Sequence, residues 1–318
     1  MIFPIGQEQI TDFFAKLIKG GRLGHAYLLL GDRGCGKKTV CNYITCMIMC
    51  AIRSACMHCN GCLTVKEGTS PDVIRINNGE KASIGVDKIR EMIKDVYVRP
   101  LISDKKVIII ENAHLLTKGA QNALLKVIEE PPEYAVFFLL CDNKSTILPT
   151  VISRVNTINI PPIKQSHLKK IVPDAPEFLY HYCRGNVGVL KELMSDEQLQ
   201  SRRSNAMKAL LSLAGDDEYD MYNYTPLLEG SNPETYAVME LMLMFVRDAM
   251  LLKYNLDETI INKDKINDIK AFSASVNSEK CFKVAECIQT AQKQLGKSGS
   301  LAIAAQTMFI KCREVIHG

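Results

Sequence analysis

Residues 25–39, His-Ala-Tyr-Leu-Leu-Leu-Gly-Asp-Arg-Gly-Cys-Gly-Lys-Lys-Thr, constrain the fold of this chain more than any other segment. An apolar run at 26–30 leads into a glycine-rich loop, and a helix-like pattern of apolar residues starts near Lys38. The residues that suit a phosphate-binding loop are Gly31, Gly34, Gly36 and Lys37. Backbone N–H groups of such a loop hold an anion together with the N-terminus of the following helix. The segment therefore predicts a P-loop, and the alternative is an ordinary strand-to-helix turn.

The residue after the P-loop lysine departs from the usual pattern. A P-loop has Ser or Thr at this position, and the hydroxyl binds Mg²⁺, whereas this chain has Lys38. Thr39 lies one residue further, about 100° around the helix, so it is a poor substitute. The extra positive charge also opposes Mg²⁺. We therefore expect a nucleotide site whose metal chemistry is impaired.

The end of another buried strand, at 107–110, should carry the acidic residues of a nucleotide-hydrolysing site. Glu111 follows this strand and could bind a metal ion, but the next residue is Asn112. A neutral amide cannot act as the base that activates water. A second position is thus unsuited to hydrolysis, although Glu111 could also simply end the strand in solvent.

Four cysteines within thirteen residues form a second distinctive cluster, Cys50-x5-Cys56-x2-Cys59-x2-Cys62. Four thiolates at such short spacing fit tetrahedral zinc, and a full set of cysteines indicates a closed structural site. Cys46 and His58 are possible substitute ligands. The alternative is a group of unligated thiols.

Alternating strands and helices predict an α/β domain. Apolar runs at 26–30, 107–110 and 136–140 read as buried strands and 72–76 as a short strand, and the segments at 6–20, 40–52, 86–97 and 120–130 read as helices. Continuous apolar strands between helices are typical of a parallel sheet that is covered on both faces.

No strand is expected beyond residue 160. Pro161-Pro162 suggests a hinge, and residues 164–194 read as short helices. Amphipathic helices are predicted at 234–254, 279–295 and 299–316. We therefore expect an α/β domain at 1–160, a small helical domain at 161–203 and a larger helical domain at 204–318.

The composition sets limits on location and partners. The 318 residues are 47% hydrophobic and 23% charged, and the net charge of +4 gives no argument for nucleic acid. No apolar run is long enough to span a membrane, and the first residues do not resemble a signal peptide. Twelve cysteines without a secretion signal suggest a reducing cytoplasm.

An arginine follows the last predicted strand. Asp142-Asn143 ends that strand, where a polar side chain could lie near a nucleotide phosphate, and Ser153-Arg154 comes about ten residues later. Arg154 could act as an arginine finger that stabilises transition-state charge in a neighbouring subunit. The alternative is a solvated surface arginine.

Several of these segments together carry a family resemblance: His25-Ala26-Tyr27-Leu28, Gly36-Lys37-Lys38, the four cysteines, Gly68-Thr69-Ser70-Pro71-Asp72, residues 122–132 (NALLKVIEEPP), Ser153-Arg154 and, more loosely, Phe245-Val246-Arg247-Asp248. They resemble the clamp-loader branch of the AAA+ family, which serves bacterial DNA polymerase III. Val155 stands where the family's Ser-Arg-Cys motif has its cysteine.

The resemblance implies an AAA+ domain, a helical lid and a C-terminal collar for oligomerisation. It also implies a cytoplasmic stator subunit that does not hydrolyse ATP and offers Arg154 to an adjacent ATP site. The implied partners are gamma/tau and delta subunits in a hetero-pentameric ring and, through that ring, the sliding clamp and primer–template DNA. Binding of ATP, ADP or Mg²⁺ by this chain itself stays open.

Two other readings remain. An active gamma/tau-type ATPase would need Thr39 or a water molecule in place of the missing hydroxyl, and Lys38 and Asn112 oppose it. A zinc-dependent nucleic-acid-binding module is disfavoured by the small net charge and by the lack of interleaved aromatic and basic residues.

Overall fold

The computed structural model describes residues 3–228, 232–295 and 301–318. It contains two compact units: residues 1–175 with 182–192, and residues 176–181 with 193–318. The chain passes between the two units at residues 175–176, 181–182 and 192–193, all within the small helical domain predicted at 161–203. The three-domain division proposed from the sequence stays a prediction.

The first unit contains all five strands of the described chain, and its elements are α1 (Glu8–Lys19), β1 (Ala26–Leu30), α2 (Lys37–Met49), α3 (Asn60–Glu67), β2 (Val73–Ile76), α4 (Val86–Val96), β3 (Lys106–Ile110), η1 (Ala113–Leu115), α5 (Lys118–Glu129), β4 (Ala135–Cys141), η2 (Lys144–Thr146), α6 (Pro149–Ile152), β5 (Asn156–Asn159), α7 (Gln165–Ile171) and most of α9 (Val187–Met194).

The second unit is helical in its described part, with α8 (Glu177–Tyr182) at its start, followed by α10 (Leu199–Ala214), η3 (Asp220–Leu228), α11 (Asn232–Lys253), η4 (Asp257–Thr259), η5 (Lys263–Lys265), α12 (Ile266–Ser275), α13 (Ser278–Leu295) and α14 (Leu301–His317).

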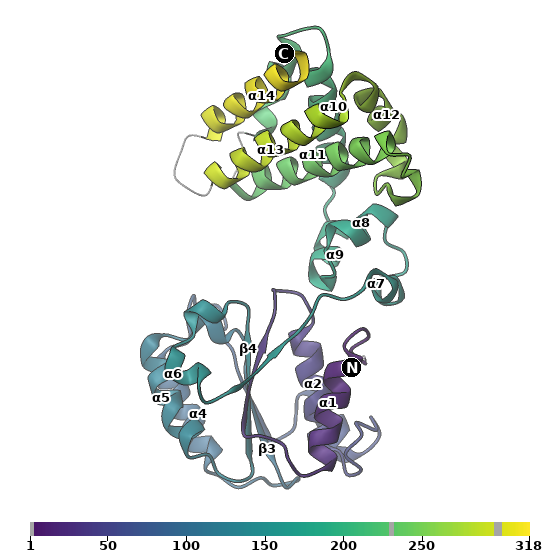
Figure 1. The fold of residues 1–318 in the computed structure, drawn as a ribbon. Helices are drawn as coiled ribbons and strands as arrows, with labels where there is room; N and C mark the ends of the chain where they lie inside the picture. Colours follow the sequence, from purple (N-terminus) through teal and green to yellow (C-terminus); the bar gives the residue numbers. More distant parts are fainter. Residues whose placement is uncertain (1–2, 229–231, 296–300) are drawn as a thin grey trace. The chain divides into compact units, whose positions relative to one another are not determined.

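The sheet of the first unit is parallel, with the strand order β2-β3-β4-β1-β5. Helices α1 and α2 cover one face, and α4, α5 and α6 cover the other (Figure 1). Strands β1, β3 and β4 are therefore buried on both sides, which explains their continuous apolar sequences. Their carboxyl ends lie at one edge, where open α/β sheets bind ligands.

The core of this unit has two layers. On the α1–α2 side, Phe14 packs edge-on against Tyr27, with the ring centroids 4.9 Å apart, and Tyr27 stacks on Phe138 at 5.5 Å. On the other side, Ile108 and Phe137 pack beneath α4 and α5. Each layer buries alternate residues of the same strands, so the sheet separates two apolar clusters.

The predicted α/β fold is confirmed, and so are its four strands, which the structure places at β1 to β4. The fifth strand, β5, was missed because Asn156–Asn159 has asparagine at both ends and lies at the sheet edge beside β1. The short helices expected at 164–194 are present as α7, α8 and α9. Of the last predicted helix, residues 299–300 lie outside the described residues.

A buried arginine joins several segments of the helical unit. Arg203 on α10 is fully buried, and its guanidinium lies 3.6 Å from the ring centroid of Phe178 on α8. Its Nη2 donates to Asn262 Oδ1 at 2.8 Å and to Asp264 Oδ1 at 2.9 Å. A buried charge is tolerated when it is paired and hydrogen-bonded. Arg203 thus ties α8 to the helical unit.

Asp72, which precedes β2, holds a loop at the other end of the sheet. Its buried carboxylate accepts hydrogen bonds from the N–H groups of Leu101, Ile102 and Ser103 at 2.6, 2.8 and 2.8 Å. Burial raises the pKa of this carboxyl, but the three N–H donors outweigh burial and the pKa is lowered. The ionised carboxylate is therefore the form that stabilises the fold.

We expect Asp72→Asn to lower the free energy of unfolding by about 2–3 kcal/mol, because the neutral amide keeps only one acceptor oxygen and its NH2 group faces buried N–H donors that lose their partner. The contribution of the ionised form is complete above the unfolded-state pKa near 3.8 and is lost as pH falls below it toward the lower folded-state value. Urea unfolding between pH 7 and pH 3 measures both effects. The exposed Asp104→Asn is the control, and equal stability of the two variants at pH 7 would contradict the prediction.

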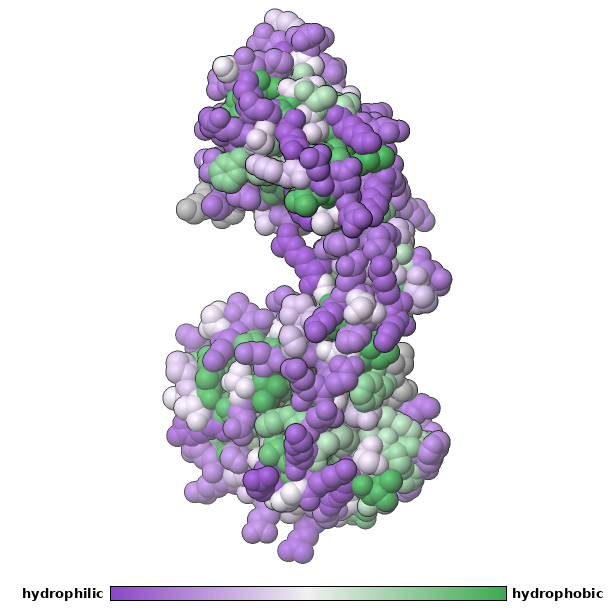
Figure 2. All heavy atoms as spheres, turned by 45° about the vertical axis from the view of Figure 1, so that its right-hand side comes forward, coloured by the Kyte–Doolittle hydropathy of each residue, from purple (hydrophilic) through white to green (hydrophobic). Residues whose placement is uncertain are grey.

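None of the helices in the described part of the chain is long and apolar enough to cross a membrane. Figure 2 shows one face of the molecule, on which polar side chains predominate and apolar ones form small separate groups.

Candidate nucleotide site and metal-binding cysteines

The predicted P-loop has the expected local structure. Strand β1 ends at Leu30, the loop follows, and α2 starts at Lys37. Gly34 and Gly36 have φ values of 84° and 97°, in the left-handed region that side chains disfavour. Glycines at these positions allow the chain to turn sharply from the strand into the helix.

The P-loop lysine points back into its own loop. Lys37 is only 8% exposed, and its ammonium donates to the carbonyl oxygens of Gly31 and Asp32, each at 2.7 Å. It also lies 2.7 Å from Oδ1 of Asp142 at the end of β4. Three oxygen partners thus satisfy the positive charge that a bound phosphate would otherwise neutralise.

Lys38 forms an ion pair with the carboxylate that follows β3. Its ammonium lies 2.9 Å from Oε1 and 3.1 Å from Oε2 of Glu111. Nη1 of Arg75 from β2 also lies 3.7 Å from Oε1 of the same carboxylate. Glu111 is therefore partly buried between two cations, and a Mg²⁺ ion would have to displace Lys38 to use both of its oxygens.

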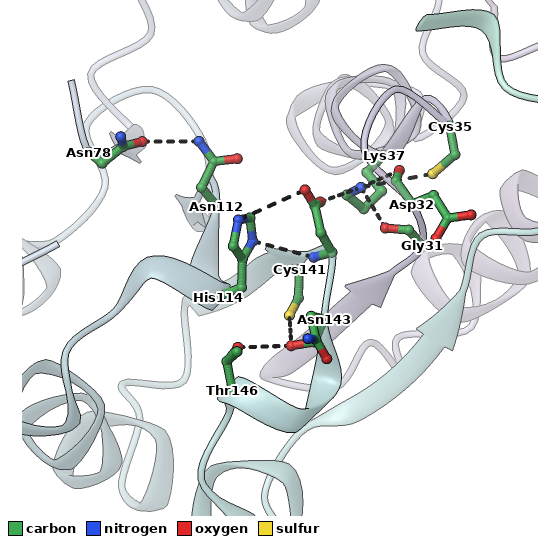
Figure 3. A network of polar contacts seen from close by, with 11 residues as sticks. Gly31, Asp32, Cys35, Lys37, Asn78, Asn112, His114, Cys141, Asn143 and Thr146 are labelled. Carbon is green, nitrogen blue, oxygen red and sulfur yellow. Dashed lines mark hydrogen bonds and ion pairs between the residues drawn. The ribbon is translucent and has the colours of Figure 1, made fainter. Parts of the chain in front are cut away.

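Asn112 and Asp142 complete the polar edge of the sheet, where Figure 3 labels Asn112, Asn78 and His114. Asn112 has a φ of 55° and donates from Nδ2 to Oδ1 of Asn78 at 3.0 Å. The backbone N–H of Asp142 donates to Nδ1 of His114 at 3.4 Å, and Oδ2 of Asp142 lies 3.8 Å from Nε2 of His114. Asp142 thus lies between Lys37 and His114, while Asn112 is directed toward Asn78.

A cavity of about 240 Å³ opens at this edge. Its lining residues are Arg33, Gly34, Gly36, Lys37, Lys38, Glu111, Asn112, Leu140 and Asp142. Six of the predicted nucleotide-site residues therefore line this cavity: Gly34, Gly36, Lys37, Lys38, Glu111 and Asn112. Gly31 takes part through its carbonyl oxygen, and the exposed Thr39 does not line the cavity.

The site also contains residues that the sequence argument did not select. Arg33 lines the cavity, Arg75 approaches Glu111, and His114 contacts Asp142. His114 lies two residues after Asn112, so its position near the end of β3 could have identified it from the sequence as a site residue. Arg75 lies inside β2, where only the pairing of β2 with β3 brings it toward Glu111.

The predicted arginine finger lies at the surface of the first unit. Arg154 is exposed, and its Nε lies 2.7 Å from Oε1 of Glu129 at the end of α5. Its Nη1 donates to the carbonyl oxygen of Thr150 at 3.0 Å and to Oγ of Ser153 at 3.2 Å. Arg154 does not line the cavity at the P-loop, so the structure does not bring it to the chain's own predicted nucleotide site.

The four predicted metal ligands lie together at the end of α2 and the start of α3. The sulfur atoms of Cys50, Cys56, Cys59 and Cys62 are all within 4.8 Å of one another, close enough to hold a metal ion. Cys46 lies outside this group, and its Sγ is 4.0 Å from the carbonyl oxygen of Cys62. The spacing along the chain thus identified the cluster correctly.

Backbone N–H groups point at the cysteine sulfurs. The N–H of Cys56 donates to Sγ of Cys50 at 3.5 Å, and the N–H of Cys59 donates to Sγ of Cys56 at 3.4 Å. Burial raises the pKa of Cys50, but hydrogen bonds from Cys56 and neighbouring N–H groups outweigh it and lower the pKa to about 6. At Cys50 the turn therefore favours the thiolate, which is the metal-binding form, whereas burial raises the pKa of Cys62.

Comparison with known proteins places both parts of the chain in one family. Residues 6–164, half of the chain, match the model for "DNA polymerase III, delta subunit". Residues 197–302 match the model for the C-terminal part of the same subunit.

Relatives in several bacteria are gamma and tau subunits of the same polymerase. The gamma subunit of Buchnera aphidicola is 28% identical over 83% of this chain and 71% of its own length. The tau subunit of Bacillus subtilis is 36% identical over 47% of this chain, and the gamma/tau subunit of Mycobacterium tuberculosis is 33% identical over 48%. The matched part spans 27% of the length of each of these last two relatives.

A solved structure of a gamma-subunit-related protein from Thermotoga maritima aligns with 95% of this chain and 98% of its own, at 19% identity and a TM-score of 0.43. This overall likeness is low, and the P-loop fold rests on the sheet and loop described above. With family models matching both parts of it, the chain belongs to the DNA polymerase III delta subunit family, as a clamp-loader subunit with a P-loop domain.

Proposed function

We propose that this chain is a delta-prime-type subunit of the DNA polymerase III clamp loader, which does not hydrolyse ATP itself. The observation that carries the proposal is the ion pair between Lys38 and Glu111. At the position of the usual metal-binding hydroxyl, the chain has an ammonium group that takes both oxygens of the acidic residue. A tethered cation thus stands where Mg²⁺ would be needed.

The neighbouring residues support the same conclusion. Asn112 follows Glu111 and cannot accept a proton from an attacking water. Lys37 already has three oxygen partners, so phosphate binding would require breaking these contacts.

We propose that the chain contributes Arg154 to the ATP site of a neighbouring subunit. Arg154 is exposed and held by Ser153 and Glu129, so it is available to a phosphate in an adjacent subunit of a ring. We propose that gamma/tau and delta subunits are the neighbours, and that the complex loads the sliding clamp on primed DNA. In that complex the chain acts as a stator.

The cysteine cluster fits structural zinc. Zinc–sulfur bonds of about 2.3 Å in a tetrahedron place sulfur atoms about 3.8 Å apart, and Sγ of Cys59 lies 3.9 Å from Sγ of Cys50. Four thiolates leave no open position for a reacting water. The ion would therefore hold the turn between α2 and α3 and take no part in nucleotide chemistry.

We expect the purified chain to hydrolyse ATP no faster than a protein-free blank, with or without Mg²⁺. Lys38→Thr should not restore turnover, because Asn112 still cannot activate water. Phosphate release measured with a purified gamma/tau subunit as the positive control tests this. Turnover by the unmodified chain above the blank would contradict the proposal.

That outcome would support the second candidate function, an active gamma/tau-type ATPase. The identity of 28% over 83% of the chain with a gamma subunit is the observation that favours it. The same assay therefore separates the two candidates.

A further inference from the structure

Two cysteines of the second unit meet between its last two helices. Helices α13 and α14 lie side by side (Figure 1) and carry Cys287 and Cys312, both of which are free thiols. Sγ of Cys312 lies 4.0 Å from the carbonyl oxygen of Val284, one helical turn before Cys287 on α13. Because a helical side chain points back over the preceding turn, the side chain of Cys287 reaches the same place.

A hydrogen bond makes the two thiols chemically different. The thiol of Cys312 donates to the sulfur of Cys287, and this bond outweighs burial and lowers the pKa of Cys287 to about 7. The same hydrogen bond, together with burial, raises the pKa of Cys312. Near neutral pH, Cys287 is therefore the nucleophile of the pair, and Cys312 is a protonated thiol beside it.

A cavity of about 390 Å³ gives access to one of the two cysteines. Of the residues that line it, Lys283 and Cys287 belong to α13, and Met308 and Lys311 belong to α14. Cys312 is fully buried and does not line the cavity. A small molecule in the cavity can thus reach Cys287 directly, whereas it reaches Cys312 only through Cys287.

Cys281 shows how an ordinary buried cysteine on the same helix differs. It is fully buried, it does not line the cavity, and burial raises its pKa. Buried thiols in apolar surroundings are inert. Cys287, by contrast, is half-buried, lines a cavity and has a second thiol in contact with its sulfur. Packing alone therefore does not account for its surroundings.

We propose that Cys287 and Cys312, the thiol pair, form a reversible redox site that reacts with small disulfides. The thiolate of Cys287 attacks one sulfur of the disulfide and forms a mixed disulfide, and the other half leaves as a thiolate that takes up a proton. Cys312 then loses its proton and attacks the sulfur of Cys287, and the second half leaves as a thiol. Two cysteine thiols are thus oxidised to one disulfide, while the small disulfide is reduced to two small thiols.

The new bond links α13 to α14 within the second unit. A strongly reducing pool of small thiols keeps the pair open, and the bond forms when small disulfides accumulate. The thiol pair shares no residue with the P-loop cavity, with Arg154 or with the four clustered cysteines. The inference therefore does not depend on the proposed function of the chain.

Treatment of the full-length chain with oxidised glutathione at neutral pH tests the proposal. After alkylation of the remaining thiols, cleavage after lysine isolates Cys287 in peptide 284–293 and Cys312 in peptide 312–318. We expect mass spectrometry to find these two peptides joined, and dithiothreitol to separate them. Cys287 should react at least about tenfold faster than Cys281, whose raised pKa leaves little thiolate. Alkylation of both Cys287 and Cys312 after the treatment would overturn the proposal.

Two variants separate the steps of the reaction. Cys312→Ser removes the second attacking thiol, so glutathione should accumulate on Cys287 as a mixed disulfide. Cys287→Ser should leave Cys312 unmodified, because Cys312 is buried away from the cavity. A Cys287 without glutathione in the first variant, or glutathione on Cys312 in the second, would refute the assigned roles.

The matched control is Cys281→Ala, which removes a buried cysteine of the same helix and should form the cross-link at the wild-type rate. If a variant fails to fold, the cross-link in the unmodified chain still decides the question. None of these measurements uses ATP turnover, so the redox site and the proposed non-hydrolysing function can fail separately.

Discussion

Replacing Arg154 by alanine is expected to lower the rate of ATP hydrolysis at the one adjacent site of a reconstituted clamp loader by about 1,000-fold, the lower end of what a trans arginine contributes, so that the complex loses the share of its turnover that this site supplies. Its guanidinium is exposed, is positioned by Ser153 and Glu129, and lies away from the chain's own P-loop cavity. We propose that an arginine so placed stabilises charge in a neighbouring site. Steady-state phosphate release by the complex on primed DNA measures the effect.

Matched variants separate the arginine from its surroundings. Arg90→Ala removes an exposed arginine that pairs with Asp87 on α4 and should leave turnover unchanged. Glu129→Ala removes the ion-pair partner of Arg154 and should change turnover by much less than Arg154→Ala. The isolated Arg154→Ala chain should unfold at the wild-type urea concentration, because exposed ion pairs contribute little stability. Wild-type turnover of the Arg154→Ala complex would exclude the trans role.

Removing the metal is the second change with a large expected effect. The purified chain should contain about one equivalent of zinc, and a strong chelator should destabilise the first unit by several kcal/mol, since metal binding is coupled to folding. Cys50 and Cys62 are buried in the apolar cluster beneath α2 together with Val65, so loss of the ion should loosen this side of the core. Elemental analysis and urea unfolding before and after chelation measure both quantities.

Two variants make this test specific: one replaces a predicted zinc ligand, and the other replaces a nearby residue outside the cysteine cluster. Cys56→Ser removes one of the four clustered sulfurs and should reduce bound zinc to well below one equivalent. His58→Ala changes an exposed side chain outside the cluster and should keep both zinc and stability. A metal-free chain that remains folded with wild-type stability would contradict the assignment of a structural ion.

Local sequence signals were sufficient for the elements whose burial is uniform. Strand β3 carries Val107 and three consecutive isoleucines, and α5 ends just before Pro131-Pro132. Both patterns report burial or backbone geometry directly. Strand β5 has no such signal, because Asn156 and Asn159 are exposed and its pairing with β1 alone makes it a strand. Helix α3 begins within the cysteine segment, whose spacing indicated ligation but no helix.

The cysteine spacing also predicted proximity correctly, since ligands a few residues apart must approach when the chain turns tightly. The P-loop was predictable for the same reason, because its glycines and its lysine are neighbours in sequence. In both cases short-range backbone geometry decides which atoms can meet.

What the sequence determined by itself was therefore the α/β fold, the P-loop with a lysine in place of its hydroxyl residue, and the cysteine cluster. Only the tertiary structure decided which charged side chains pair with one another and which backbones touch. Lys38 meets Glu111 across 73 positions of sequence, Lys37 is bound by Asp142, and Gly188 lies against Gly34. These contacts depend on which strands are neighbours and on how closely two backbones approach, and distances between segments far apart in the chain are not encoded in any local pattern.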